Sequence, residues 1–206
     1  MQGLYLVTPN WDDTDRLLAA TDAALRGGAA MVQYRHKQAN EALRLEQGSA
    51  LLALCRRYRR PLVVNDHIGL CRQLDADGVH LGASDLALAD ARALLGPGKI
   101  VGASCYGDLG LARAAQAAGA SYIAFGGFYP SPVKQYDFVT PPALLETARE
   151  ELTLPLVVIG GMTPANAAPL VARGADMVAA ITAVYADPEP AEAARRFVAL
   201  FAARQL

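Results

Sequence analysis

Eight short apolar runs alternate along the chain with longer segments rich in Ala, Leu and Arg, and this alternation constrains the fold most strongly. Short apolar runs are typical of buried strands, whereas Ala, Leu and Arg at helical spacing are typical of amphipathic helices. The pattern therefore indicates repeated βα units. The predicted strands are Leu4–Val7, Met31–Tyr34, Leu62–Asn65, Gly78–Leu81, Ile100–Ala103, Tyr122–Phe125, Leu156–Ile159 and Met177–Ala180. The predicted helices include Asp13–Arg26, Asn40–Tyr58, Leu109–Ala118, Pro164–Arg173 and Pro190–Ala203.

Several predicted strands follow the same kind of phrase, in which small residues precede the apolar run. Gly-Ala-Ser precedes Tyr122 and Gly-Ala-Asp precedes Met177. A glycine at this point ends the incoming helix and lets the chain turn into the next strand. Thr163 followed by Pro164 is a typical helix start, with Thr163 as the N-cap. The repetition favours a closed, near-symmetric array.

Eight βα pairs predict a single-domain (β/α)8 TIM barrel of the α/β class, spanning residues 1–206. The barrel would be compact, because this fold usually takes ~250 residues. The alternative is an open, doubly wound sheet, which would need a GxGxxG turn after the first strand. The chain instead reads Thr8-Pro9-Asn10-Trp11 after Val7, so the barrel is favoured.

Charge, hydropathy and cysteine content limit the classes of partner, location and site that we expect. The chain has 19 basic and 20 acidic residues and a net charge of -1, so no global field favours nucleic acid or an anionic membrane. No apolar run reaches membrane-spanning length and no leader is recognisable, so we expect a cytoplasmic protein. The three cysteines lack metal-binding or disulfide spacing and are expected to be reduced packing residues. The sequence leaves open whether the chain forms a homo-oligomer.

Polar residues follow nearly every predicted strand, which is where a TIM barrel carries its chemistry. After the second strand, period-two alternation puts Gln33, Arg35 and Lys37 on one face, although solvated charges at a strand edge would look the same. Polar residues and glycines at the other strand ends are Asn65, Asp66, His80, Asp85, Ser104, Ser131, Lys134, Gly160, Gly161 and Thr182. Their shared position predicts one site built from many strands.

Asp66 and Asp85 follow adjacent strands and could supply the oxygen ligands of Mg²⁺. Each could instead cap the helix that follows it, because Asp is a favoured N-cap. The nearby cations Arg35, Lys37 and Lys134 favour the metal. Cations and a carboxylate-held metal suit a pyrophosphate leaving group, whose charge develops as its bond to carbon breaks.

Gly160 and Gly161 predict a second anion site, because the loops after strands seven and eight commonly bind phosphate in this fold. Thr182 would complete that site, although a glycine pair also serves in any tight turn. We expect His80 to contact substrate without acting as an acid or base. Cys105 is expected to be a packing residue, since no base with recognisable spacing accompanies its thiol.

These motifs together resemble the thiamine-phosphate synthase family, also called thiamine-phosphate pyrophosphorylase. They occur in family order over nearly the whole chain. The matching segments are Val32–Lys37, Val64–Asp66, Ala76–Gly82 with Asp85, Gly102–Tyr106, Phe128–Lys134, Ile159–Thr163 and Gly174–Val178.

The resemblance implies an alkyl transferase that joins hydroxymethylpyrimidine pyrophosphate to a thiazole phosphate, through a pyrimidine carbocation, and releases pyrophosphate. It also implies which residues bind each group. Gln33 and His80 would contact the pyrimidine; Arg35, Lys37, Asn65, Ser104 and Lys134 would hold the pyrophosphate; Asp66 and Asp85 would carry Mg²⁺; and Ser131, Gly161, Ile181 and Thr182 would bind the thiazole phosphate. Tyr34 and His36, which point the other way, are expected to be scaffold.

The chain departs from the family pattern near Lys134. Val133 replaces a residue that usually carries a hydroxyl, and Gln135-Tyr136 follow where Pro is common. Two alternatives to a synthase stay open. One is an isomerase resembling the thiazole tautomerase, which needs no metal and pyrophosphate cluster. The other is a catalytically silent binder of thiamine phosphate, which Val133 would favour.

Overall fold

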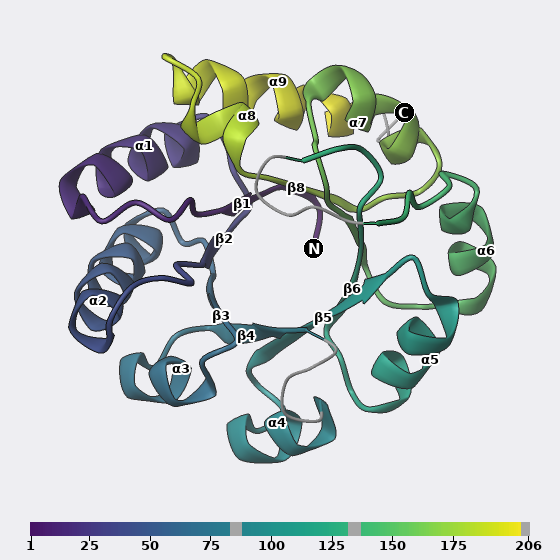
Figure 1. Cartoon of the computed structure of the whole chain (residues 1–206), viewed down its shortest axis with the longest axis horizontal. Helices are drawn as coiled ribbons and strands as arrows, with labels where there is room; N and C mark the ends of the chain where they lie inside the picture. The colour runs from purple at the N-terminus through teal and green to yellow at the C-terminus, as the bar shows by residue number, and fades with distance from the viewer. Residues whose placement is uncertain (83–87, 132–136, 203–206) are drawn as a thin grey trace.

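The computed structural model describes residues 1–82, 88–131 and 137–202, and its strands form a closed parallel barrel in the order of the sequence (Figure 1). Each strand pairs with the next, and β1 closes the barrel against β8. The strands are β1 Gly3–Val7, β2 Met31–Tyr34, β3 Leu62–Asn65, β4 Gly78–Leu81, β5 Ile100–Tyr106, β6 Tyr122–Phe125, β7 Leu156–Val158 and β8 Met177–Ala180. The closure confirms the TIM barrel and excludes the open sheet.

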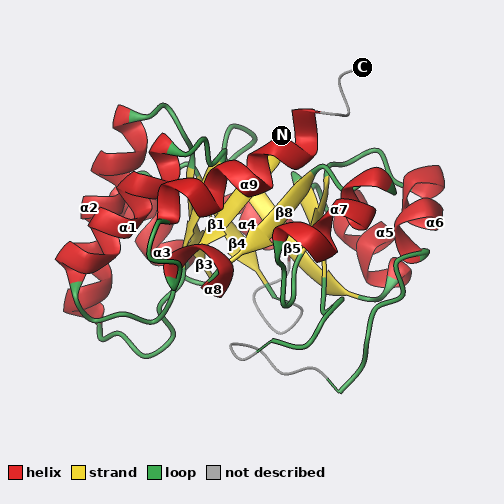
Figure 2. Cartoon of the chain, turned by 90° about the horizontal axis from the view of Figure 1, so that it is seen from above, coloured by secondary structure: helices red, strands yellow, loops and turns green. Residues whose placement is uncertain are grey.

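Helices surround the barrel as an outer layer, visible from the side in Figure 2. They are α1 Thr14–Arg26, α2 Glu41–Arg57, α3 Ile68–Leu74, α4 Leu88–Leu95, α5 Leu109–Ala117, α6 Leu144–Glu151, α7 Pro164–Ala172, α8 Thr182–Tyr185 and α9 Pro190–Ala202. The predicted N-cap is confirmed, because the Thr163 hydroxyl accepts a hydrogen bond from Asn166 N at 3.3 Å. Among the described helices, none is long and apolar enough to cross a membrane.

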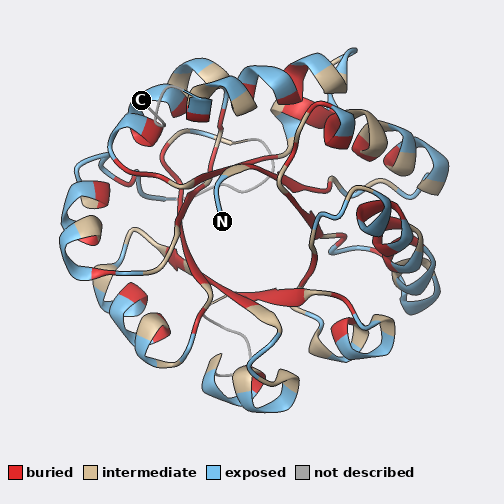
Figure 3. Cartoon of the chain, turned by 180° about the vertical axis from the view of Figure 1, so that it is seen from behind, coloured by how far each residue is buried: buried red, intermediate tan, exposed pale blue. Residues whose placement is uncertain are grey.

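The barrel wall separates two apolar layers. Side chains that point inward, among them Val7, Met31 and Val157, fill the barrel interior, whereas the opposite faces of the strands pack against the helices. Figure 3 shows the consequence, with a buried barrel wall and exposed outer faces on the helices. The strands read as continuous apolar runs because both of their faces are buried.

The polar residues in the repeated phrases before strands have a role beyond helix termination. The side chains of Asp77, Ser121 and Asp176 precede β4, β6 and β8, and each accepts a hydrogen bond from a backbone N–H near the start of β3, β5 or β7, at 2.8, 3.0 and 2.8 Å. Each therefore ties its strand to the strand before it. This polar contact holds the register at the amino-terminal rim, opposite the predicted site.

Candidate active site

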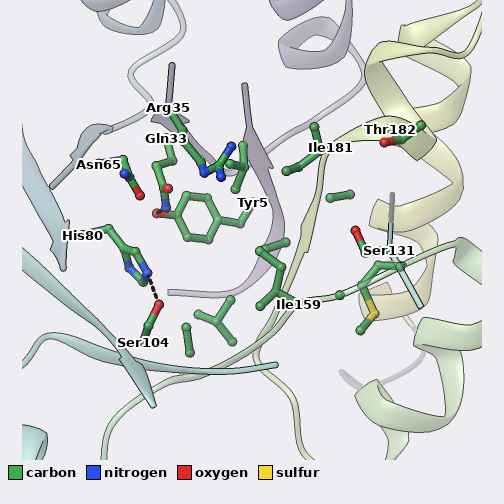
Figure 4. Close-up of a pocket in the computed structure, with 18 of the residues that line it drawn as sticks. Tyr5, Gln33, Arg35, Asn65, His80, Ser104, Ser131, Ile159, Ile181 and Thr182 are labelled. Carbon is green, nitrogen blue, oxygen red and sulfur yellow. Dashed lines mark hydrogen bonds between the residues drawn. The ribbon is translucent and has the colours of Figure 1, made fainter. Parts of the chain in front are cut away.

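A pocket of about 420 Å³ opens at the carboxyl ends of the strands (Figure 4). Its size suits small organic ligands, and its floor is formed by apolar residues of the barrel interior such as Val157 and Ala179. Twelve predicted site residues line it: Gln33, Arg35, Lys37, Asn65, Asp66, His80, Ser104, Ser131, Gly160, Gly161, Ile181 and Thr182. Two further predicted residues, Asp85 and Lys134, lie outside the described residues, as do Val133, Gln135 and Tyr136.

The pocket has two chemically different sides. We call the side formed by β2 to β5 the polar half, comprising Gln33, Arg35, Lys37, Asn65, Asp66, His80 and Ser104. We call the other side the glycine half, comprising Ser131, Gly160, Gly161, Thr163, Ile181 and Thr182. Figure 4 shows labelled residues of the two halves on opposite sides of the cavity.

The first loop of the chain holds the basic segment of the polar half in place. The buried hydroxyl of Thr8 accepts a hydrogen bond from Arg35 N at 2.8 Å and donates to Arg35 O at 3.1 Å. Asn10 Oδ1 accepts from Lys37 N at 3.2 Å. Arg35 and Lys37 both line the pocket, as the alternation along the segment predicted. The bonds to Thr8 and Asn10 fix the backbone that carries them.

Tyr34 and His36 point away from the pocket and act as scaffold, which confirms the prediction for both. The Tyr34 hydroxyl donates to Gln47 Oε1 at 3.1 Å. The buried His36 ring contacts Asp12 Oδ1 at 2.9 Å through Nε2 and accepts from Ala39 N at 3.1 Å through Nδ1. These contacts fasten the loop after β2 to its neighbours.

Asp66 does not cap the helix that follows it. The N-cap of α3 is His67, which makes no side-chain capping bond. Asp66 instead has a positive φ of 63° and its carboxylate lines the pocket, where Oδ2 lies 3.9 Å from Lys37 Nζ and accepts from Asn65 Nδ2 at 2.6 Å. The capping alternative is therefore wrong for Asp66.

The described residues do not form a complete metal cage. No group of three or more His, Cys, Asp or Glu side chains in residues 1–82, 88–131 and 137–202 is arranged to hold a metal. Asp66 is the carboxylate among the described lining residues. One or two carboxylates suit Mg²⁺ that arrives with phosphate oxygens as its remaining ligands. The donor set therefore fits a metal shared with a substrate.

A continuous hydrogen-bonded chain crosses the barrel beneath the polar half. Gln33 Nε2 donates to Tyr5 Oη at 2.6 Å, and Tyr5 Oη lies 2.7 Å from Tyr122 Oη. His80 then links Tyr122 Oη, 2.8 Å from Nδ1, to Ser104 Oγ, 2.9 Å from Nε2. These hydrogen bonds join residues of β2, β1, β6, β4 and β5. Neither tyrosine was predicted from the sequence to belong to the site.

One local signal accounts for the position of Tyr122. A Cβ atom at Gly102 would fall on the Tyr122 ring, so the missing side chain makes room for this tyrosine inside the barrel. The ring stacks on His80 with centroids 5.6 Å apart and an interplanar angle of 12°. Gly102 belongs to the segment before Ser104, but its partner lies 20 residues away and sequence spacing could not identify it.

The strand β5 runs further than predicted, to Tyr106, and its pairing with β6 shifts register between Ser104 and Tyr106. Such bulges often re-aim side chains beside active sites. Cys105 lies within this segment and is buried, and burial raises the pKa of its thiol to about 12. A thiol that stays protonated is a poor nucleophile, which agrees with the prediction that Cys105 is a packing residue.

The glycine half is formed by backbone at close quarters. Gly160 and Gly161 both have positive φ, of 111° and 60°. A Cβ at Gly160 would lie 2.7 Å from Gly127 Cα, and one at Gly161 would overlap Pro130 O, next to Ser131. The glycine pair therefore lets two loops touch and leaves backbone exposed to the pocket.

Asn166 fixes this loop and was also missed in the sequence. Its Oδ1 accepts from Thr163 N at 2.8 Å and its Nδ2 donates to Gly161 O at 2.9 Å. The capping box of α7 and the turn at Gly161 thus share one side chain. Thr182, the first residue of α8, also lines the pocket, so the loop after β7 and the start of α8 both face the cavity.

Comparison with known proteins identifies the family. A family model described as thiamine monophosphate synthase matches residues 4–184. The chain belongs to the thiamine monophosphate synthase family. A thiamine-phosphate synthase from Janthinobacterium sp. (strain Marseille) is 58% identical over 202 residues, covering 98% of each chain. One from Thiobacillus denitrificans is 52% identical and covers 98% of this chain and 95% of the relative.

A solved structure supports the same family assignment. The thiamine phosphate pyrophosphorylase from Pyrococcus furiosus superposes with a TM-score of 0.86 at 30% identity, covering 98% of this chain and 96% of that one. Both the fold and the resemblance inferred from the motifs are therefore confirmed.

Proposed function

We propose that this chain condenses 4-amino-2-methyl-5-hydroxymethylpyrimidine pyrophosphate with 4-methyl-5-(2-phosphooxyethyl)thiazole to form thiamine phosphate and pyrophosphate. The observation that carries the proposal is the division of one pocket into a cationic polar half and a glycine half. The reaction needs two anion sites that flank two heteroaromatic rings. Membership of the thiamine monophosphate synthase family and relatives at 58% and 52% identity support the same reaction.

In the proposed mechanism the bond between the pyrimidine methylene carbon and the pyrophosphate oxygen breaks first. Its electron pair leaves with pyrophosphate, and the methylene cation is stabilised by the amino-substituted ring. The lone pair of the thiazole nitrogen then forms the new C–N bond. Arg35 and Lys37 would offset the charge that develops on the leaving oxygen, aided by N–H and O–H donors of Asn65 and Ser104. Lys134 would add a third cation.

Asp66, together with Asp85, would hold Mg²⁺ against the pyrophosphate. When bound, the ion would neutralise charge on the leaving group. Gln33 and His80 would contact the pyrimidine ring, because they reach the cavity from neighbouring parts of the polar half. Ser131, Gly161, Ile181 and Thr182 would hold the thiazole phosphate so that its nitrogen faces the methylene carbon.

The test is product formation by the purified chain with both substrates, with and without Mg²⁺. We expect thiamine phosphate only when both substrates and the metal are present. A tautomerase-like isomerase would convert the thiazole phosphate alone, without metal. A silent binder would retain thiamine phosphate in equilibrium dialysis and form none. Either result would overturn the proposal.

A further inference from the structure

The hydroxyls of Tyr5 and Tyr122 can be satisfied only if hydrogen bonds run in one direction along the chain. Both side chains are buried, and each hydroxyl has two partners but a single hydrogen. Each must therefore donate once and accept once, because a buried hydroxyl without an acceptor is costly. Burial raises the pKa of both phenols, so both hydrogens remain in place.

Gln33 sets the direction. Its Nε2 faces Tyr5 Oη and can only donate, so Tyr5 donates to Tyr122 and Tyr122 donates to His80 Nδ1. The proton of the neutral imidazole then lies on Nε2, which donates to Ser104 Oγ. Ser104, whose oxygen accepts this bond, keeps its own hydrogen for the pocket.

The opposite direction would place different groups in the pocket. If Gln33 presented Oε1 to Tyr5, every bond would reverse and Ser104 would donate to His80. Ser104 would then turn lone pairs toward a cavity lined by Arg35 and Lys37, where an anion is expected to bind. The first direction presents a donor to that anion, so it fits the charge of the polar half.

We infer that Tyr5 and Tyr122 are positioning residues, which fix the neutral His80 tautomer and turn the Ser104 hydrogen toward the leaving pyrophosphate. The role toward pyrophosphate rests on the proposed function, whereas the direction of the hydrogen bonds does not. At its other end, the same chain holds the Gln33 amide with its carbonyl oxygen available to the pocket. A carbonyl oxygen accepts a hydrogen bond from an exocyclic amine, the group that an aminopyrimidine carries.

The direction can be measured in the substrate-free protein by ¹⁵N NMR of labelled histidines. The chain has three histidines, and the His80 signals are those lost in His80→Gln. We expect a bare Nδ1 and a protonated Nε2, with mixed tautomers in Tyr122→Phe. A proton on Nδ1 in the wild-type protein would overturn the inference.

Kinetics test whether the tyrosines act through their neighbours. Tyr122→Phe keeps the ring stacked on His80 but removes the link, so we expect kcat to fall about tenfold, the loss of roughly one hydrogen bond. Combined with Ser104→Ala, the same change should lower kcat no further, because both remove one interaction. Additive losses would contradict action through Ser104.

Tyr5→Phe removes the hydrogen bonds that join Gln33 to Tyr122 and leaves the bond from Tyr122 to His80. Its main effect should be a higher KM for the pyrimidine pyrophosphate, because Gln33 loses its anchor. A control is Tyr185→Phe, which also removes a buried hydroxyl, bonded to Thr21 at 3.0 Å, and should leave kcat unchanged. If Tyr185→Phe lowers kcat as much as Tyr122→Phe, the tyrosines are merely structural.

Failure of the two proposals can be distinguished. A wild-type chain that forms no thiamine phosphate would overturn the proposed function and, with it, the role toward pyrophosphate. In that case the His80 tautomer would still show in which direction the hydrogen bonds run. Normal product formation with Tyr122→Phe at the wild-type kcat would overturn the inference alone.

Discussion

The two halves of the pocket are built by different physical means. The polar half uses long side chains from β2 to β5, held by Thr8, Asn10 and a buried hydrogen-bonded chain. The glycine half uses backbone, brought close by positive φ at Gly160 and Gly161. A side chain can be replaced without moving the backbone, whereas a site formed by backbone depends on the packing of its loop. Mutations should therefore separate the halves in both kind and size of effect.

The largest expected effect is in the polar half, at Asp66. Asp66→Asn keeps the shape of the side chain and tolerates a positive φ, but it removes the charge. We expect product formation to fall by about 10²–10³-fold, the range found when one charge-stabilising group is lost from a site. The measurement is kcat as a function of Mg²⁺ concentration, which should show a raised metal requirement.

A matched control for this change is Asp90→Asn, which removes a carboxylate from the exposed face of α4. It should leave both the rate and the metal requirement unchanged. If Asp66→Asn retains the wild-type Mg²⁺ dependence, the carboxylate serves only to hold Lys37 and Asn65, and the metal is bound elsewhere.

A smaller and more selective effect is expected in the glycine half. Gly161→Ala introduces a Cβ that overlaps Pro130 O at a φ of 60°, so the loop that carries Ser131 must shift. Strain of this kind costs about 1–3 kcal/mol. We expect the KM for the thiazole phosphate to rise at least tenfold while the KM for the pyrimidine pyrophosphate stays constant, measured by varying each substrate in turn.

Gly96→Ala provides a control with similar backbone strain outside the pocket. Gly96 has a φ of 79°, and a Cβ there would meet open space. This variant should lose stability without a change in either KM. Equal KM values in Gly161→Ala and the wild-type chain would mean that the glycine pair is only a turn.

The same contrast explains which parts of the molecule could be predicted from sequence. Apolar runs and helical spacing are local, so most strands of the barrel agree with prediction to within a residue. Short helices such as α3 and α4 were not predicted, because seven or eight residues carry little periodicity. Strand-end side chains of the polar half were found because their positions follow from the barrel.

Residues whose contacts depend on partners far away in the sequence could not be predicted from local patterns. Tyr5 and Tyr122 are 117 positions apart and look like ordinary core aromatics in their strands. Their hydrogen bonds depend on barrel closure and on the space left by Gly102. Asn166 similarly looked like a residue within a helix, and only the folded loop shows that it binds Gly161 O.

The smallest predicted effect tests whether Asn166 positions the glycine half or merely caps α7. Asn166→Ala removes one side of the capping box and the bond to Gly161 O, so we expect a loss of about 1 kcal/mol in unfolding free energy. Asp13→Ala removes the N-cap of α1, whose carboxylate accepts from Arg16 N at 2.9 Å, and should cost a similar amount. Denaturant unfolding would measure both losses. If Asn166 also positions backbone for the thiazole phosphate, its variant alone should raise that KM by a few fold; equal KM values in the two variants would limit Asn166 to stability.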